Sequence, residues 1–511
     1  MKKRFQLIFT VILFLSFFVV SALFADPINS ESKDHILKLT IFYMNDPHGH
    51  YNSRPVEGAQ GLSGGFAKAQ SVINQARKQN EAQGRRTLFV LGGDLLSGTS
   101  FSTVFKGAMG VHLLNTMGLD AMVVGNHEFD YGLDNLVNRL KPEMRFALLS
   151  SNIVSSDGNL LFEGHSIKNP DPGGSAPQVM IIGLTTPETP TITSPGNVDG
   201  LRFLEPVSTN KDILSKISDN RFVLALTHLG LAADKILASS CPRINVIIGG
   251  HSHTTLPEPV RVGETLICQA GAYSEFLGRL DIDFQAGKII SYSGKLISLD
   301  STIEEDPTIS GIVENYKILM GNEFQRVLGE NKLELEASRS LVRSDSPNLL
   351  AKLIASLVAK SVGADLALLN GGSIRSGLKP GTIILDDVYS VLPFDDKVVK
   401  LHLKGNDIKY ALERSLQLPD NSGGKLQHHG IEMTIESGKV EISKINGRPF
   451  ELDKDYWVAM GEFLASGGDG YKIFVDKAEN RIDSGLMIRD LLVNFIENKT
   501  IVNQEDVEKL N

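Results

Sequence analysis

Six short runs of apolar and β-branched residues constrain the fold of this chain more than any other feature of its sequence. They lie at residues 37–44, 87–91, 121–124, 179–184, 222–226 and 245–248. Runs of this kind predict strands of a sheet that is covered on both faces. Amphipathic stretches at 65–79 and 111–117 lie between them. The pattern predicts an α/β domain built in layers, a sandwich of βαβ type.

The remainder of the chain predicts a second, smaller α/β domain. Asp306 followed by Pro307 marks a helix start, and apolar residues then recur at helical spacing up to Gly329. We therefore expect one amphipathic connector helix over 306–329. Further elements are expected at 347–362 (helix), 365–369 and 398–403 (strands) and 431–445 (hairpin). The expected domains are 36–300 and 330–505.

Composition narrows the function classes. The 51 Lys and Arg residues against 60 Asp and Glu residues give a net charge of −9, which argues against a nucleic-acid polymer as partner. Cys241 and Cys268 are the two cysteines, too few for a disulfide framework or a cysteine-rich zinc site. One bridge and two free thiols both remain open.

Residues 1–25 have the composition of a secretion signal. Lys2, Lys3 and Arg4 precede a mostly apolar run, and small residues stand near Ala22 and Ala25. This predicts cleavage near Ala25 and a protein that works in the periplasm or outside the cell. An uncleaved anchor is the alternative. No second run of about 18 apolar residues follows, so we expect no membrane contact in the mature form.

Polar side chains follow five of the predicted strands. The segments are Asn45-Asp46-Pro47-His48, Gly92-Gly93-Asp94, Asn126-His127-Glu128-Phe129-Asp130, Thr227-His228 and His251-Ser252-His253. Because the carboxyl ends of strands in open α/β sheets line the ligand crevice, we expect these side chains to converge. A single Asp-x-His or His-x-His pair is weak evidence, whereas five such segments in order predict a metal site. Imidazole, carboxylate and amide donors without thiolate favour Zn, Mn, Fe, Co or Ni, and the imidazole content argues against Ca.

These segments resemble the calcineurin-like metallophosphoesterases, and within them the bacterial and animal 5′-nucleotidase family, which includes periplasmic UDP-sugar hydrolases. The resemblance extends from about residue 37 to about residue 473. It implies a metallophosphoesterase sandwich domain that binds two divalent cations, zinc, manganese or similar. One cation would be held by Asp46, His48, Asp94 and His253, and the other by Asp94, Asn126, His228 and His251. Asp94 would bridge the two.

The resemblance also assigns roles beside the metals. Two cations roughly 4 Å apart polarise the phosphoryl oxygens and supply a nucleophile near neutral pH. His127 would not be a ligand but would pair with Asp130 and either stabilise the transition state or assist the leaving oxygen. A His/Asp pair that caps a helix is the alternative.

In the second domain, Asn370-Gly371-Gly372-Ser373-Ile374-Arg375 resembles the family motif Asn-Gly-Gly-x-x-Arg. This implies that Asn370, Gly372 and Arg375 take part in substrate binding, with Arg375 on the phosphate. Arg339 and Arg343 would share one side of a helix, and similar arginines in relatives complete the anion pocket. A solvated basic face is the alternative, because the segment from Ser344 to Asn348 departs from the family pattern.

Two further segments of the second domain match those whose phenylalanines enclose a nucleobase in the family. They place Phe394 and Phe463 on the base and Asp469 on the ribose or in support of its turn. Core aromatics are the alternative. Asp396 stands where relatives usually carry Asn, and a carboxylate there could alter base preference or repel a charged substrate. His428 and His429 are expected in an exposed loop.

The sequence therefore predicts a secreted dinuclear-metal phosphohydrolase that releases phosphate from nucleoside 5′-monophosphates, with UDP-sugars and nucleotide diphosphates as further candidate substrates. The alternatives within this fold are a 2′,3′-cyclic-nucleotide phosphodiesterase with 3′-nucleotidase activity and a thiosulfohydrolase-like relative. A non-catalytic nucleotide-binding surface protein is the alternative from another class. The expected partner is the small nucleotide substrate, and the oligomeric state is open.

Overall fold

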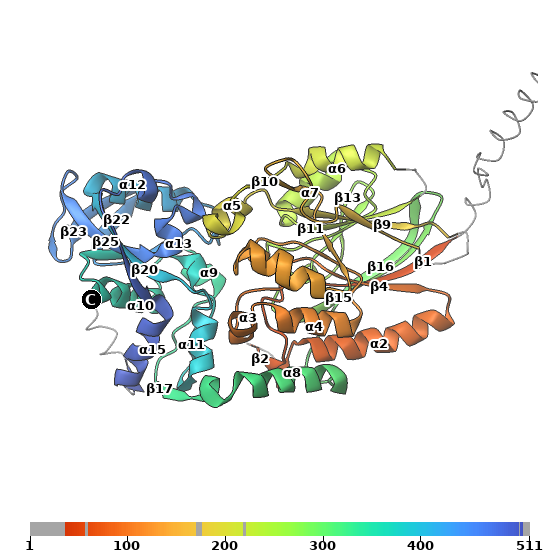
Figure 1. Cartoon of the computed structure of the whole chain (residues 1–511), viewed down its shortest axis with the longest axis horizontal. Coiled ribbons are helices and arrows are strands. Elements are labelled where there is room, and N and C mark those ends of the chain that lie inside the picture. Colours follow the sequence, from red (N-terminus) through yellow and green to blue (C-terminus); the bar gives the residue numbers. More distant parts are fainter. Residues whose placement is uncertain (1–35, 57–59, 170–175, 218–220, 500, 504–511) are drawn as a thin grey trace, which may run out of the picture.

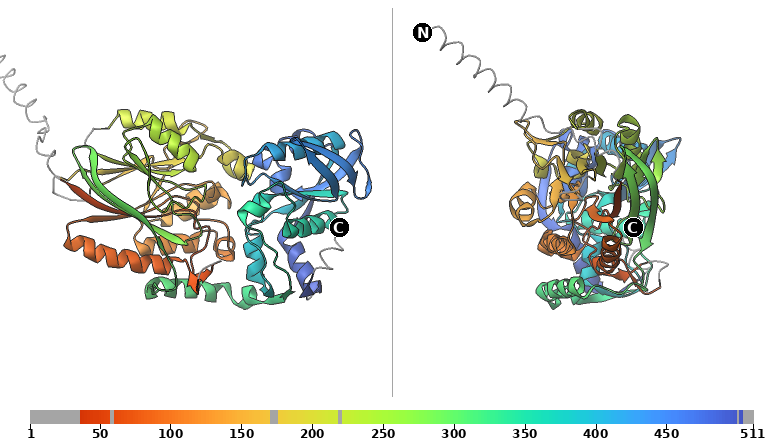
Figure 2. Two further views of the ribbon diagram at one scale, coloured as in Figure 1. Left: turned by 180° about the vertical axis from the view of Figure 1, so that it is seen from behind. Right: turned by 90° about the vertical axis from the view of Figure 1, so that its right-hand side faces the viewer.

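The computed structural model describes residues 36–56, 60–169, 176–217, 221–499 and 501–503 (Figure 1). The predicted secretion signal at residues 1–25 lies outside these ranges. None of the helices within them combines the length and the apolar character that a membrane span requires. Two domains lie side by side along the long axis (Figures 1 and 2).

The N-terminal domain contains two six-stranded mixed sheets. The first has the order β16-β15-β1-β4-β5-β6, and the second has the order β13-β14-β12-β11-β9-β8. The strands of the first sheet are β1 (Leu37–Met44), β4 (Arg86–Leu91), β5 (Ala121–Val123), β6 (Ala147–Leu149), β15 (Phe276–Gln285) and β16 (Lys288–Ser298). Those of the second are β8 (His165–Lys168), β9 (Val179–Thr185), β11 (Phe222–His228), β12 (Val246–Ile248), β13 (Val260–Val262) and β14 (Thr265–Cys268).

The central strands of each sheet run parallel, so their carboxyl ends lie at one edge. β1 pairs in parallel with β4, β4 with β5, and β11 with both β9 and β12. All six predicted strand runs are strands, and this confirms the predicted layered α/β class.

Apolar side chains fill three layers of this domain. Ile41 and Val90 of the first sheet meet Ile181 and Leu224 of the second in a core between the sheets. The outer face of the first sheet is covered by α2 (Phe66–Ala82), α4 (Ala108–Met117) and α8 (Pro307–Met320), and that of the second by α6 (Pro206–Ser215) and α7 (Leu231–Ser240). Figure 1 shows the helices above and below the paired sheets.

Short elements complete the domain. They are β2 (Arg54–Pro55), β3 (Leu62–Ser63), β7 (Ile153–Ser155), β10 (Leu201–Phe203), α3 (Ser100–Phe105), α5 (Thr189–Ile192), the 3-10 turns η2 (His127–Phe129), η4 (Lys141–Glu143) and η5 (Pro195–Val198), and the π-helical η3 (Asn135–Leu140).

The connector helix is shorter than the sequence predicts. Asp306 caps its start by accepting hydrogen bonds from the backbone N–H groups of Thr308 and Ile309 at 3.0 and 3.1 Å. The helix α8 ends at Met320, because Gly321 adopts a φ of 74° that a helix cannot continue. The 3-10 turn η6 (Asn322–Gln325) and the strand β17 (Val327–Asn331) follow. The expectation of one helix over 306–329 is therefore wrong beyond residue 320.

The C-terminal domain is built on a five-stranded sheet in the order β21-β18-β25-β20-β26. Its strands are β18 (Leu366–Asn370), β20 (Lys397–Lys404), β21 (Leu426–His429), β25 (Asp455–Gly461) and β26 (Arg481–Met487). One face packs on α10 (Leu349–Ser361) and α15 (Ile488–Lys499), and the other on α12 (Gly405–Gln417), α13 (Glu462–Ala465) and α14 (Ile473–Asp476).

Smaller elements surround this sheet. Two three-stranded sheets are formed by β17, β19 (Gly381–Ile384) and β27 (Ile501–Val502), and by β22 (Ile431–Glu436), β23 (Lys439–Ile445) and β24 (Arg448–Pro449). The helices are α9 (Arg339–Val342) and α11 (Leu385–Val391), with 3-10 turns η7 (Gly371–Ser373) and η8 (Gly468–Gly470).

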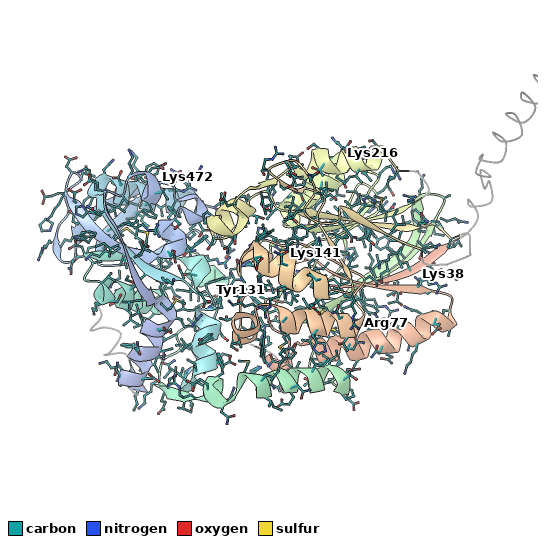
Figure 3. The ribbon with its side chains drawn as sticks, in the orientation of Figure 1. Lys38, Arg77, Tyr131, Lys141, Lys216 and Lys472 are labelled. Atoms are coloured by element: carbon teal, nitrogen blue, oxygen red, sulfur yellow. The ribbon has the colours of Figure 1, made fainter. Side chains whose placement is uncertain are left out.

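The two domains touch through specific elements. Within the described ranges α5 lies against η8, and α3 lies against α11. Thr103 Oγ1 in α3 donates a hydrogen bond to the carbonyl of Pro393 at 3.1 Å. Tyr131 lies at this junction (Figure 3), and burial raises the pKa of its hydroxyl to about 12. The contacts bring the strand ends of the N-terminal domain to face the C-terminal domain.

Candidate active site

Most of the predicted metal ligands stand on left-handed backbone. The φ angles are 51° at Asp46, 47° at His48, 55° at Asp94, 75° at His251 and 56° at His253. Residues with a Cβ rarely adopt this region, and such strain gathers at functional sites. Gly93 also has a positive φ, of 84°, and in addition lies close to His228, since a Cβ at Gly93 would be 2.7 Å from Nδ1 of His228.

One group of donors comes from the turns after β1 and β12. His48 Nε2 lies 3.1 Å from His253 Nε2, and His253 Nε2 lies 3.3 Å from Asp46 Oδ1. Burial lowers the pKa of His253 to about 4 and that of His48 well below its usual value. Two neutral imidazole lone pairs and a carboxylate therefore face one point, an arrangement that a cation would satisfy.

A second group lies beside the first. Asn126 Oδ1 lies 3.2 Å from His228 Nε2 and 3.1 Å from His251 Nδ1. Asp94 Oδ2 lies 3.1 Å from His228 Nε2 and 3.7 Å from His48 Nε2, which places Asp94 between the two groups. Although burial opposes it, the charge of Asp94 raises the pKa of His228 to about 10. His228 Nε2, Asn126 Oδ1 and Asp94 Oδ2 thus lie close enough together to hold a cation.

Backbone carbonyls orient two of these imidazoles. His48 Nδ1 lies 3.1 Å from the carbonyls of both Leu96 and Ser97, and His228 Nδ1 lies 2.7 Å from that of Gly92. Nδ1 must carry the proton in these hydrogen bonds, which leaves Nε2 free to bind a metal. The donor set thus fits divalent cations.

His127 pairs with Asp130 as predicted. His127 Nδ1 lies 2.7 Å from Asp130 Oδ2, and the His127 backbone N–H donates to Asp94 Oδ1 at 3.0 Å. Burial disfavours the charged imidazole, but the charges of Asp130 and Asp94 outweigh it and raise the pKa of His127. His127 is also near enough to His48 and Asp94 to form a third group that could hold a cation.

Three arginines of the C-terminal domain face this centre. Arg375 Nη2 lies 3.4 Å from His48 Nε2 across the domain junction. Arg339 begins α9 and Arg343 follows it, and in the described part of the chain Arg339 Nη1 and Arg343 Nε are buried without a hydrogen-bond partner. Burial, and next the charge of Arg375, lowers the pKa of both. Guanidinium groups that lie close together and have N–H donors without partners form a suitable binding site for an anion.

A hydrogen bond joins the Asn370-Gly371-Gly372 segment to the turn Gly467-Gly468-Asp469-Gly470. Asn370 Nδ2 donates to Asp469 Oδ2 at 2.8 Å. Burial raises the pKa of Asp469 to about 6, against the effects of Asn370 and Arg343. The backbone N–H of Gly372 donates to the carbonyl of Gly423 at 2.8 Å, so Gly372 offers space rather than a free donor.

The two predicted stacking residues lie in different surroundings. The Phe394 ring lies 6.0 Å from the His127 ring at an angle of 20°, with the Arg375 guanidinium carbon 5.8 Å from its centre. Phe463 packs on Gly468, where a Cβ would lie 2.5 Å from its ring. Asp396 connects the two segments, because its Oδ1 accepts the Phe463 backbone N–H at 3.1 Å. Burial raises the pKa of Asp396 to about 6.

Comparisons with known proteins match both halves of the chain. The calcineurin-like phosphoesterase model matches residues 39–255, and the model of the 5′-nucleotidase C-terminal domain matches residues 327–476. A mouse 5′-nucleotidase is 28% identical over 91% of this chain and 89% of its own. The crystal structure of a 5′-nucleotidase precursor from Thermus thermophilus has a TM-score of 0.81 at 27% identity and covers 91% of this chain and 97% of its own.

The chain belongs to the 5′-nucleotidase family of calcineurin-like phosphoesterases. Membership makes it a metal-dependent phosphoester hydrolase. Another relative, the trifunctional nucleotide phosphoesterase protein YfkN of Bacillus subtilis, is 30% identical over 87% of this chain but only 33% of its own length.

Sequence reasoning missed the role of Glu128, which stands inside the Asn-His-Glu-Phe-Asp segment of this family member. Its buried carboxylate accepts hydrogen bonds from the backbone N–H groups of Asp94, Leu95 and Gly125 at 2.9, 2.7 and 2.6 Å. Burial, and then the charge of Asp94, raises the pKa of Glu128 to about 7. Glu128 thereby fixes the turn that carries Asp94. The sequence offered one signal for this role, since Glu128 is a carboxylate in the middle of the polar segment 126–130.

Two other sequence questions have answers. His428 and His429 belong to β21 and are partly buried, so the expectation of an exposed loop is wrong; pairing with β18 places them in the sheet. Burial lowers the pKa of each to about 4. Cys241 and Cys268 are buried free thiols.

Proposed function

We propose that this chain releases phosphate from nucleoside 5′-monophosphates with the help of two divalent cations. The observation that carries the proposal is the position of Arg375 and Phe394. Both belong to the C-terminal domain, yet Arg375 contacts His48 and the Phe394 ring faces His127. A phosphate at the metal centre would meet a guanidinium, and the attached nucleoside would extend toward an aromatic surface.

The proposed ligands are Asp46, His48, Asp94 and His253 for one cation and Asp94, Asn126, His228 and His251 for the other. Two divalent cations, zinc, manganese or similar, supply Lewis-acid chemistry when bound, activating water and neutralising phosphoryl charge.

Side chains of this protein do the remaining work in the proposed reaction. Arg339, Arg343 and Arg375 bind the phosphoryl oxygens, because a guanidinium matches two oxygens at once. His127 stabilises the transition state or donates a proton from Nε2 to the leaving oxygen, and Asp130 orients it. The nucleoside is held by Phe394, Phe463, Asn370, Gly372 and Asp469.

Metal removal tests the reaction class. We expect purified protein to release phosphate from 5′-AMP, to lose that activity after chelation, and to regain it with Mn or Zn, because hydrolysis depends on the cations. Free phosphate is measured in each state. An enzyme that stays fully active with no bound metal would contradict the proposal. A protein that binds two cations but leaves 5′-AMP intact would contradict only the choice of substrate.

Phe463→Ala tests the nucleobase site. Stacking contributes about 1–3 kcal/mol per base, so we expect the KM for 5′-AMP to rise about 10-fold. Hydrolysis of glycerol phosphate, which has no base, should stay within about twofold. Tyr410→Ala is the matched control, since Tyr410 is an exposed aromatic residue of the same domain. Equal losses on both substrates would contradict a role in base binding.

Substrate range follows from the same assay. The panel includes UDP-sugars, nucleotide diphosphates, 2′,3′-cyclic nucleotides and sulfur esters, and the Bacillus relative named as trifunctional supports testing more than one nucleotide ester. We also propose domain limits at 36–300 and 330–505. Secretion to the periplasm or outside the cell is proposed from the basic and apolar character of residues 1–25.

A further inference from the structure

The Asp130 carboxylate is held by three side chains from separate parts of the N-terminal domain. Its Oδ2 lies 2.7 Å from His127 Nδ1 and accepts a hydrogen bond from Ser97 Oγ at 2.5 Å. Its Oδ1 accepts a hydrogen bond from Thr193 Oγ1 at 3.3 Å. Among the interactions of the described residues, this is the donor to Oδ1. Without it, the remaining hydrogen bonds to this carboxylate that the structure shows would all go to Oδ2, and the rotation of the group about its Cβ–Cγ bond would be less restricted.

Thr193 lies in a segment that begins and ends at the active site. The segment follows β9, whose carboxyl end lies at the same edge of the sheet as His228. The backbone N–H of Thr186 donates to the carbonyl of His228 at 2.9 Å, and Asn197 Nδ2 donates to the carbonyl of Asp130 at 3.1 Å. Thr193 itself is only 2% exposed. The segment is therefore fixed at both ends.

The same segment contacts the other domain. Its helix α5 ends directly before Thr193 and lies at the junction with the C-terminal domain (Figure 1). There α5 contacts η8, the turn that carries Asp469. The Thr193 hydroxyl, which donates to Asp130, thus lies next to the contact between the N-terminal domain and the proposed nucleoside site of the C-terminal domain.

We propose that Thr193 is a positioning residue whose hydroxyl fixes the Asp130 carboxylate and thereby orients the His127 imidazole. The inference rests on the role proposed above for His127. A buried hydrogen bond to a charged group holds its acceptor in one orientation, and a misdirected imidazole slows proton transfer. Thr193 affects the reaction only through Asp130, so its loss slows turnover and leaves substrate binding unchanged.

The test compares three variants with the wild-type holoenzyme on 5′-AMP. Thr193→Val keeps the shape but removes the donor, and we expect kcat to fall about 10-fold with KM within twofold. Thr193→Ser restores the donor and should recover at least half of the wild-type kcat. Thr191→Val is the matched control, because Thr191 is exposed in the same helix and its hydroxyl donates to the carbonyl of Glu188 at 2.8 Å. Its kcat should equal that of the wild type.

Metal content and a nuclear magnetic resonance signal separate this inference from the proposed function. Both cations should remain bound in every variant. The proton on His127 Nδ1, identified by its absence in His127→Gln, should be slow to exchange in the wild type and in Thr193→Ser and faster to exchange in Thr193→Val. This signal reports the position of His127 even in a protein that does not hydrolyse 5′-AMP.

Several results would overturn the proposal. They are a wild-type kcat in Thr193→Val, a Thr193→Ser variant as slow as Thr193→Val, a rise in KM alone, and loss of metal from Thr193→Val. An unchanged exchange rate of the His127 proton would do so as well.

Discussion

Asp94→Ala should abolish metal binding and phosphate release together. Asp94 Oδ2 lies 3.1 Å from His228 Nε2 and 3.7 Å from His48 Nε2, so the carboxylate stands between the two donor groups. Its removal takes a ligand from both proposed cations and leaves buried histidines facing each other. Cations in such sites lower the activation barrier by several kcal/mol, so we expect kcat to fall by at least about 10⁴-fold when they are lost.

Elemental analysis of the purified variant, with phosphate release from 5′-AMP, measures both effects. Asp281→Ala is the matched control, because Asp281 is a carboxylate of β15 that bonds Thr40 and Arg279 away from the metal centre. This control should bind metal and turn over normally. An Asp94→Ala protein with two cations and full activity would contradict the bridging role.

His127→Gln should lower turnover while both cations stay bound. Nδ1 of His127 faces Asp130, and its ring lies against Phe394. A general acid or base of this kind contributes about 10²–10⁴-fold, so we expect kcat to fall by that factor and KM to change little. His127 also lies near His48 and Asp94, so the geometry permits it to act either as a catalytic residue or as a metal ligand. The metal content of the variant distinguishes these two roles.

The control is His112→Gln, which changes a histidine of α4 whose Nδ1 lies 3.5 Å from Tyr316 Oη. It should behave as the wild type. Loss of one cation from His127→Gln would make His127 a ligand and contradict the proposed catalytic role. An unchanged kcat would contradict it equally.

The strands and the converging strand ends could be predicted from the sequence because both depend on local patterns. The run at 37–44 is the strand β1 at the same limits, and the polar segments after the parallel strands meet at one edge. The connector helix α8 ends at Met320, earlier than the sequence predicts. Apolar residues continue at helical spacing past Gly321, although the backbone leaves the helical conformation at this glycine. The spacing of apolar residues shows which side chains could share one face of a helix, but it does not show that a glycine will adopt a positive φ and end the helix.

Contacts between distant segments could not be predicted in this way. The positions of Phe394 against His127 and of Arg375 against His48 depend on how two domains meet. The bond from Thr193 to Asp130 joins residues 63 positions apart, and no spacing rule links them. Glu128 carried a visible signal, but its three backbone partners became evident only in the folded turn.

Bound metal should stabilise the fold of this protein, because five proposed ligands have left-handed backbone. They are Asp46, His48, Asp94, His251 and His253. At about 1–3 kcal/mol for each strained residue, the left-handed backbone at these five residues opposes folding. Cations that bind only the folded chain offset this cost by mass action. Removal of metal is therefore expected to lower the free energy of unfolding as well as the activity, and the metal-loaded protein should have the higher melting temperature.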